Sequence, residues 1–451
     1  MSDAAKLTRG SIRGHLVTQT LPMIIGVAAI MSIGLVDAYF IGQLGATQLA
    51  AISFIFPISV AITSMGVGVM VGINSVVARA LGEGDLGRAA RRANLGMVFA
   101  AVLGVAMGLA LFALLDPLFA LMNADAETLP FIRTYMQPFA LGFPLMMAIM
   151  GINGTLRGQG EARRTSYISV CYAAVNWILD PILITGAFGF EGLGIVGAAY
   201  ATLIGWACGI GFGIWLIKGT PIPLNPAICL QGKIAEPLGA IMRVAGPAAF
   251  SNSINPIGLS VLTALVAAEG QAAVAGFGAA GRLQSFAVVP LLALSASIGA
   301  IVGQNWGAGE RERSRRAMRY AFAFCLVYGL ATAVVLFGFG EKFADLFTND
   351  RAVIEEFAAY LAIAVWGYAG FGLLIVGNGI LNAVDKASLA LMQSAARVFL
   401  IMLPFAWLLR GAWGADAIYA AELTANVVGG ALAALIAWRV LGARHARDLA
   451  G

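Results

Sequence analysis

Residues 177–184, WILDPILI, place the carboxylate of Asp180 and the proline Pro181 inside an otherwise apolar run. The run lies within a longer apolar segment, residues 166–188. A helix needs about 20 apolar residues to cross a hydrocarbon core about 30 Å thick, so the segment predicts a membrane-spanning helix that carries an acid. A charge at that depth is costly and usually faces an interior cavity. Asp180 is therefore a candidate functional residue.

The whole chain has the composition of a membrane protein. Its 451 residues are 60% hydrophobic and 11% charged, with a mean hydropathy of +0.87. A soluble protein of this length needs a more polar surface. Apolar runs separated by Gly, Pro or charged residues predict an all-α protein with twelve spans. The spans are residues 17–42, 49–76, 94–115, 131–153, 166–188, 193–217, 240–266, 273–302, 318–339, 353–380, 390–409 and 415–439.

Basic residues are distributed unevenly over the connections between these spans. The termini and the even-numbered loops hold 22 of the 28 Lys and Arg residues. Cytoplasmic loops carry such an excess, so both termini are predicted to be cytoplasmic, in a plasma membrane of the bacterial inner-membrane type. The net charge of +5 is explained by this topology, and we expect no nucleic-acid partner.

Several classes of function have no support in the sequence. The four cysteines show neither metal-ligand spacing nor a disulfide framework, and the two histidines lie in the termini. The segment Gly82-Glu83-Gly84 lacks the strand context of a nucleotide site. The sequence predicts no enzyme, no ATP-driven pump and no resident cofactor.

The chain contains an internal repeat. A shift of 225 residues superimposes Pro22 on Pro247, residues 82–85 on 307–310, and Asn153-Gly154 on Asn378-Gly379. Six helices per copy start both copies on the same side of the membrane, which predicts parallel repeats. The predicted domains are an amino-terminal lobe (1–217), a cytoplasmic linker (218–239) and a carboxy-terminal lobe (240–451). Two facing lobes predict a central cavity and alternating access.

The repeat also shows where the copies differ. Asp37 corresponds to Leu262 and Asp180 to Phe405, so these acids belong to the first copy alone. Residues needed only for the fold would be expected in both copies, although a structural role at the helix ends stays open. Asp37 and Asp180 lie eight and nine residues before external loops, about 12–15 Å below them.

Two further polar residues are predicted to lie at the same depth. Asn176 precedes Asp180 by four residues and shares its helix face, and Thr202 lies ten residues after Gly192. Oxygen ligands of this kind suit Na⁺, while a close pair of buried acids could instead hold one proton. The coupling ion, Na⁺ or H⁺, stays open. Pro22 and Pro181 predict helix bends, and Pro181 frees the carbonyl oxygen of Trp177.

Four segments carry a resemblance to a known family. They are Leu21-Pro22 with residues 34–42 (GLVDAYFIG), residues 153–160 (NGTLRGQG), residues 176–181 (NWILDP) and residues 197–202 (GAAYAT). Together they resemble the multidrug and toxic compound extrusion (MATE) transporters, in particular the DinF-like branch. The resemblance covers nearly the whole chain. The larger superfamily also contains lipid and polysaccharide flippases.

The resemblance implies a V-shaped pair of six-helix bundles that exports organic, often cationic amphipathic compounds in exchange for Na⁺ or H⁺. It implies a cation site at Asp37, Asn176, Asp180 and Thr202. A NorM-like branch has an acid eight residues after the proline of its seventh span, where this chain has Asn255. That departure argues against a carboxy-lobe cation site of the NorM kind.

Substrate contacts are less well defined by the sequence. We expect the substrate cavity to be lined by Tyr39, Asn153, Trp177, Asn255, Arg282 and Asn378, and a monomer surrounded by membrane lipids. Arg282 and Glu422 are buried charges whose roles stay open. A lipid or glycolipid flippase is the alternative function, and a cationic cavity that could hold phosphates would favour it.

Overall fold

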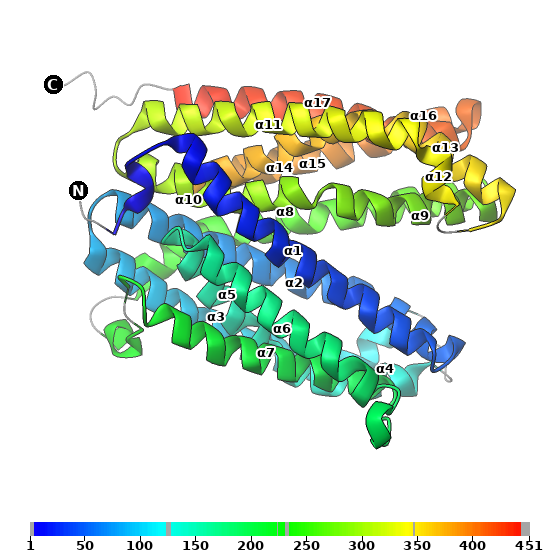
Figure 1. The fold of residues 1–451 in the computed structure, drawn as a ribbon, viewed down its shortest axis with the longest axis horizontal. Helices are drawn as coiled ribbons and strands as arrows, with labels where there is room; N and C mark the ends of the chain where they lie inside the picture. Colours follow the sequence, from blue (N-terminus) through cyan, green and yellow to red (C-terminus); the bar gives the residue numbers. More distant parts are fainter. Residues whose placement is uncertain (1–3, 123–127, 223, 231–233, 346–347, 443–451) are drawn as a thin grey trace.

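Apolar runs longer than a bilayer is thick fold into long helices, because helices satisfy every backbone hydrogen bond within lipid. The computed structural model describes residues 4–122, 128–222, 224–230, 234–345 and 348–442. In these ranges eleven helices are long and apolar enough to cross a membrane, or twelve if the bent pair α4 and α5 forms one span. The predicted twelve spans and the all-α fold are confirmed. The structure contains two helical bundles, which meet at the end that holds both termini and diverge toward the other end (Figure 1).

The first bundle contains seven α-helices in its described residues. They are α1 (Ile12–Gly42), α2 (Ala46–Gly82), α3 (Leu86–Leu121), α4 (Leu129–Leu141), α5 (Phe143–Gly158), α6 (Ala162–Leu183) and α7 (Ile195–Ile217). The axes of α4 and α5 differ by 47° at the break between them. Helix α5 continues five residues past the predicted end of its span at residue 153.

The second bundle repeats this arrangement with more interruptions. Its α-helices are α8 (Ala235–Ala267), α9 (Gln271–Ala287), α10 (Val289–Gly307), α11 (Arg311–Gly338), α12 (Gly340–Ala344), α13 (Arg351–Ala364), α14 (Tyr368–Ala383), α15 (Ala387–Ala395), α16 (Leu403–Trp413) and α17 (Ala415–Gly442). A π-helical segment, Ala396–Met402, joins α15 to α16. Helix α8 begins inside the predicted linker, because residues 235–239 form its first turns.

Backbone geometry repeats with the same offset of 225 residues. Positive φ angles occur at Gly45 and Gly270 (137° and 128°), at Gly84 and Gly309 (81° and 78°), and at Gly189 and Gly414 (83° and 56°). A fourth pair joins a glycine to an aspartate, namely Gly160 (73°) and Asp385 (63°). Aspartate tolerates this region better than most residues. The two copies therefore share their turns as well as their helices.

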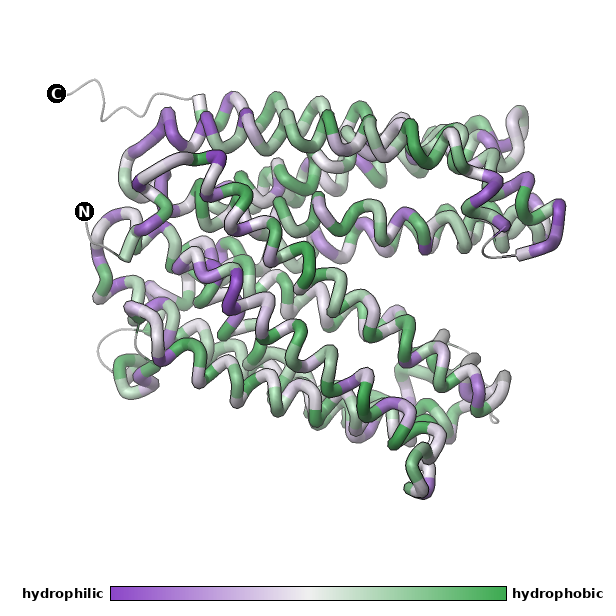
Figure 2. Tube along the Cα trace, viewed as in Figure 1, coloured by the Kyte–Doolittle hydropathy of each residue, from purple (hydrophilic) through white to green (hydrophobic). Residues whose placement is uncertain are grey.

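Hydropathy follows the expected arrangement. Hydrophobic residues cover the helix lengths, and hydrophilic residues gather toward the helix ends and connections (Figure 2). Small residues allow helices to approach closely inside each bundle. At Gly430, for example, an added Cβ would lie 2.3 Å from the carbonyl oxygen of Gly370, where α17 crosses α14.

Where the bundles meet, one helix of each bundle packs partly on the other bundle. The first turns of α1 pack on the second bundle, because Ile12 and Leu16 share a core with Leu291 and Ile298 of α10. The first half of α8 packs on the first bundle, where a Cβ added at Gly72 would meet Ala245 at 2.9 Å. Each lobe is thus held to the other by a helix that continues into its own core.

Candidate functional site

Three helices of the first bundle bring the predicted cation ligands together. Asp180 of α6 is fully buried, and Asn176, one turn earlier, is 1% exposed. The amide nitrogen of Asn176 donates to the hydroxyl of Thr202 of α7 over 3.4 Å. The carboxyl of Asp37 of α1 interacts electrostatically with Asp180 and lies within hydrogen-bonding reach of Asn176. Of the predicted set, all four residues lie in one site.

Four acceptor atoms of this site have no hydrogen-bond partner among the described residues. They are Oδ1 of Asp37, Oδ1 of Asn176 and both carboxylate oxygens of Asp180, all buried. Buried acceptors of this kind need a donor or a cation. Carboxylate, amide and hydroxyl oxygens are ligands for a hard cation, and a proton shared between the two acids would also satisfy part of the set. The residues present fit either ion.

Helix α1 is attached to α6 at its proline. The hydroxyl of Ser166 of α6 donates to the carbonyl oxygen of Pro22 over 2.6 Å. A Cβ added at Gly26 of α1 would lie 3.1 Å from Ser166, so the helices are in close contact there. Asp37 lies fifteen residues beyond Pro22 on the same helix. The position of Asp37 relative to Asp180 therefore depends on how α1 passes over α6.

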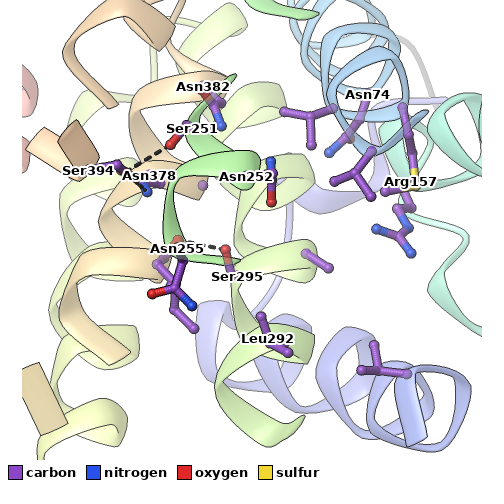
Figure 3. A pocket seen from close by; sticks show the side chains of 18 of the residues that line it. Asn74, Arg157, Ser251, Asn252, Asn255, Leu292, Ser295, Asn378, Asn382 and Ser394 are labelled. Carbon is purple, nitrogen blue, oxygen red and sulfur yellow. Dashed lines mark hydrogen bonds between the residues drawn. The ribbon is translucent and has the colours of Figure 1, made fainter. Parts of the chain in front are cut away.

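A central cavity of about 460 Å³ lies between the two bundles. Its walls combine apolar side chains with many amides and hydroxyls (Figure 3). Figure 3 shows Asn74 and Arg157 on one side, opposite Asn252 and Asn378 on the other. The amides are Asn74, Asn153, Asn252, Asn255, Asn378 and Asn382. Asn153, Asn255 and Asn378 therefore line the central cavity, as expected from the sequence.

Two predicted substrate contacts are on the wrong face of their helices. Tyr39 and Trp177 are 66% and 38% exposed and do not line this cavity. Trp177 follows Asn176 directly, so it points about 100° away around the helix axis. The prediction that these two residues line the central cavity is wrong.

The third misplaced contact is Arg282, which is exposed and also absent from the cavity wall. The buried face of α9 carries Ala273, Gly276, Phe277 and Ala280. Arg282 lies two residues after Ala280 and therefore on a different side of the helix. Glu422, the other charge singled out in this lobe, is 2% exposed and accepts hydrogen bonds from Gln284 (2.7 Å) and Tyr360 (2.9 Å).

Two arginines that were not predicted from the sequence also line the cavity. Arg157 lies in the last turn of α5, beyond the predicted end of its span at residue 153, and Arg397 lies in the π-helical segment. The quoted motif at residues 153–160 contains Arg157, and Arg397 falls inside a predicted span. For Arg397, a basic residue within an apolar run was the available signal.

The cation site and the cavity are connected along two helices. On α6, Tyr172 lines the cavity, and Asn176 and Asp180 follow at intervals of four residues on the same face. On α1, Ile30 lines the cavity and Asp37 lies two turns further along. An ion at the acids is therefore separated from a bound solute by one or two helical turns.

An ion-pair cluster joins the lobes on the side of the cavity nearer the termini. Arg79 of α2 contacts Asp385 at 3.4 Å and donates to the carbonyl oxygen of Ala383 over 2.9 Å. Arg243 of α8 contacts the other oxygen of Asp385, also at 3.4 Å. The hydroxyl of Ser75 donates to the carbonyl oxygen of Asn382 over 2.6 Å. These contacts close the cavity toward the termini.

We expect Arg79→Gln and Asp385→Asn to be coupled. Each removes the same ion pair, so the double variant should be less destabilised than the sum of the singles, by about 0.2–1 kcal/mol for this partly exposed pair. Thermal unfolding midpoints in detergent measure the cycle. Asp345→Asn, an exposed acid of the same lobe, is the control. Strict additivity of the two substitutions would contradict a pairing between the lobes.

Comparison with family models gives two matches within this chain. The model of the MatE family matches residues 22–182 and, a second time, residues 247–408. This chain belongs to the MatE family. The two matches to MatE begin at Pro22 and Pro247, which confirms the internal repeat at an offset of 225 residues.

Individual MatE relatives cover nearly the whole chain. A protein of Shewanella oneidensis named FAD transporter is 33% identical over 90% of this chain and 90% of its own length. The multidrug export protein MepA of Staphylococcus aureus is 24% identical over 93% of this chain and 92% of its own length. A crystal structure of a mutant of the Vibrio cholerae MATE transporter VcmN aligns with a TM-score of 0.92 at 29% identity. The alignment covers 98% of this chain and 99% of the VcmN chain. The MatE chain described here is therefore a multi-pass membrane transporter and not an enzyme.

Proposed function

We propose that this protein exports an organic solute in exchange for inward-moving Na⁺ or H⁺, which binds at Asp37, Asn176, Asp180 and Thr202. The observation that carries the proposal is a pair of acids, Asp37 and the buried Asp180, one to two turns from a cavity between two lobes. Three of their carboxylate oxygens are buried and have no hydrogen-bond partner among the described residues. The match of residues 34–42 and 176–181 to the DinF-like pattern supports the same site. The transporter works as a monomer in a bacterial plasma membrane.

The excess of basic residues near the termini supports a cytoplasmic location for both ends. With that orientation, the contacts between the lobes close the cytoplasmic side, and the diverging bundles face outward (Figure 1). An ion entering from outside reaches the acids in this state. Ion binding favours the outward state only through its higher affinity for that state, and solute release is the result.

Each residue of the site has a distinct role in this mechanism. Asp180 and Asn176 form the fixed part on α6, and Thr202 completes it from α7. Asp37 is on α1, whose passage over α6 is set by the Pro22 contact with Ser166. Neutralising the two acids removes their repulsion, so an ion allows Asp37 and Asp180 to approach. The movement of α1 as a whole then transmits ion binding to the cavity wall at Ile30.

Names of the relatives suggest two kinds of solute for this chain, a flavin dinucleotide and a broader set of drugs. A lipid or glycolipid flippase is the second candidate function, because Arg157 and Arg397 give the cavity the positive charge that a phosphate headgroup needs. Two carboxylates of the first lobe have oxygens without a hydrogen-bond partner among the described residues, and this favours ion-coupled export.

Reconstituted vesicles test the proposal. Flavin adenine dinucleotide (FAD) and a cationic dye, ethidium, are enclosed separately, and a Na⁺ gradient and a pH gradient are imposed one at a time. We expect one gradient to drive loss of at least one solute above the rate in protein-free vesicles. Correct insertion is checked by protease protection of the termini. Transport of neither solute under either gradient, with intact insertion, would overturn ion-coupled export.

A further inference from the structure

We infer that the central cavity selects an organic anion, whose phosphate or carboxylate groups are held by Arg157 and Arg397. The inference rests on the proposed function and names its substrate class. It differs from the cationic compounds that the family resemblance implies. Among the described residues that line the cavity, these two arginines are the charged side chains, and none of the lining residues is Asp, Glu, Lys or His.

Arg157 carries a charge without an ionic partner. No carboxylate of the described residues lies within 4.0 Å of its guanidinium, and its Nε is buried and without a hydrogen-bond partner. On its own side of the cavity Arg157 interacts electrostatically with Tyr172, whose phenol carries no charge at neutral pH. Arginine stays protonated in proteins, and a buried unpaired charge is costly. An anion in the cavity would supply the missing partner.

Arg397 is held in a fixed orientation by neutral groups. Its Nε and Nη2 donate to Oδ1 of Asn426 over 3.0 and 2.6 Å, and its Nη1 donates to Oδ1 of Asn255 over 2.8 Å. The guanidinium lies 5.1 Å from the ring centroid of Phe371. These contacts orient the charge but do not cancel it. Glu422 acts electrostatically on Arg397, but it already accepts hydrogen bonds from Gln284 and Tyr360 and is not in ion-pair contact with the guanidinium.

The local backbone supports a ligand-binding role for Arg397. The residue lies in the π-helical segment Ala396–Met402, and such segments occur frequently at functional sites. The residue 225 positions earlier is Tyr172, so the second copy has a cation where the first has a phenol. Arg157 corresponds in turn to Asn382, which also lines the cavity. Each lobe therefore contributes one arginine, from positions that are not equivalent.

This placement favours an elongated anion or one with two negative groups, because the arginines come from opposite lobes. Guanidinium groups bind phosphate and carboxylate in a bidentate manner. A solute that contacts both arginines also ties the lobes together. Its release then follows when the cavity widens and one of the contacts is lost.

The remaining wall suits a planar, hydrogen-bonding ring. Oδ1 of Asn74, Asn153 and Asn382 are buried acceptors without a partner among the described residues. Amide side chains recognise the donor and acceptor edges of heterocycles in pairs. Met70, Met150 and Phe371 supply adaptable apolar surface for the ring faces. The cavity therefore fits a heteroaromatic compound that carries phosphate or carboxylate.

Binding to purified protein in detergent tests the inference without a gradient. The probes are FAD, riboflavin, which has the same ring system but no phosphate, and the cation ethidium. On the wild-type protein we expect FAD to bind at least about tenfold more tightly than riboflavin, and ethidium to bind more weakly than FAD. This comparison needs no variant, so it does not depend on the folding of a mutant.

Variants then assign the charge to the arginines. Arg157→Gln and Arg397→Gln should each weaken FAD binding by about 10- to 100-fold and leave riboflavin binding nearly unchanged. Arg157→Lys should restore part of the loss, which a structural role of the side chain would not predict. Arg282→Gln, an exposed arginine outside the cavity, is the matched control. Unchanged FAD binding in both arginine variants, or tighter binding of ethidium than of FAD, would overturn the inference.

A final arm separates a soluble phosphate from a lipid headgroup. Lysophosphatidylglycerol is added as a competitor for FAD. Failure to displace FAD supports a soluble anion. Displacement that depends on Arg157 supports the same phosphate site with a lipid as its occupant, while displacement that survives Arg157→Gln contradicts the assignment. Ethidium export without FAD binding would defeat the anion inference alone, whereas FAD binding without gradient-driven export would defeat the proposed function alone.

Discussion

Asp180→Asn is expected to abolish gradient-driven export, by about 100-fold or more, while solute binding and folding persist. Coupling requires the ion to bind one conformation better than the other, and a ligand without that preference shifts no population. Asparagine keeps the size of the side chain but removes its negative charge and its ability to take up a proton. The same substitution at Asp37 should have the same effect, because both carboxyls belong to one site.

The stability of Asp180→Asn distinguishes a loss of coupling from a loss of structure. Both oxygens of Asp180 are buried without a hydrogen-bond partner among the described residues. Replacing such a charge by a neutral amide is expected to leave the thermal midpoint unchanged or raise it. Asp416→Asn, an exposed acid at the same end of the second lobe, is the control and should export normally. Export rates of the Asp180 and Asp37 variants equal to wild type would remove both acids from the mechanism.

If Na⁺ is the coupling ion, its binding has a readout that needs no solute. A ligand at about 100 times its Kd stabilises the folded state by about 2.7 kcal/mol. Na⁺ should therefore raise the unfolding midpoint of the wild-type protein above the value in K⁺, and the shift should vanish in Asp180→Asn. Equal midpoints in Na⁺ and K⁺, together with export driven by a pH gradient, would assign the site to protons.

Gly307→Leu is expected to reduce export by at least about tenfold by preventing closure on the side of the termini. A Cβ at Gly307 would lie 2.2 Å from the carbonyl oxygen of Arg79 on the facing lobe, and one at Gly82 would lie 2.1 Å from the carbonyl oxygen of Gln304. These contacts are with backbone atoms, which cannot rotate away as a side chain can. Overpacking costs about 1–3 kcal/mol or more in a closely packed region, and here the lobes can relieve it by separating.

Labelling of a buried cysteine shows whether separation occurs. Ala78 of α2 is fully buried and faces the second lobe near Gly303. In a protein without its native cysteines, Ala78→Cys should resist alkylation, and adding Gly307→Leu should make it reactive. Gly239→Leu, at an exposed helical glycine whose Cβ meets nothing within 4 Å, is the matched control. If Gly307→Leu left both the alkylation of Ala78→Cys and export unchanged, the two lobes would not be in close contact at Gly307.

The sequence was sufficient for the features that depend on periodicity and composition. Span number follows from apolar length, and the repeat follows from landmarks that share one offset. The cation ligands could be grouped because Asn176 and Asp180 lie four residues apart, and because Asp37 and Thr202 lie at a similar distance from their loops. These relations are set by the rise and turn of the helix and need no knowledge of neighbouring helices.

The cavity wall was predicted less well, because helix rotation decides which side chains enter it. Trp177 and Asn176 are adjacent in sequence yet face different environments, and only the packing of α6 on α1 fixes which one is inside. Hydropathy predicts a loop at Arg157, because charge usually ends a span. Helix α5 instead continues to Gly158. A basic residue in that extra turn reaches the cavity, which hydropathy alone does not reveal.

The exchange of helix ends between the bundles gives α1 the properties of a rigid lever. Its first turns are anchored in the core of the second bundle, and its far end carries Asp37 beside Asp180. With 31 residues it is about 46 Å long. A small rotation of α1 at Asp37 would therefore displace its first turns at the opposite membrane face, where they pack on the second bundle. Ion binding would therefore affect the second bundle through one continuous helix, whether or not a solute occupies the cavity between the bundles.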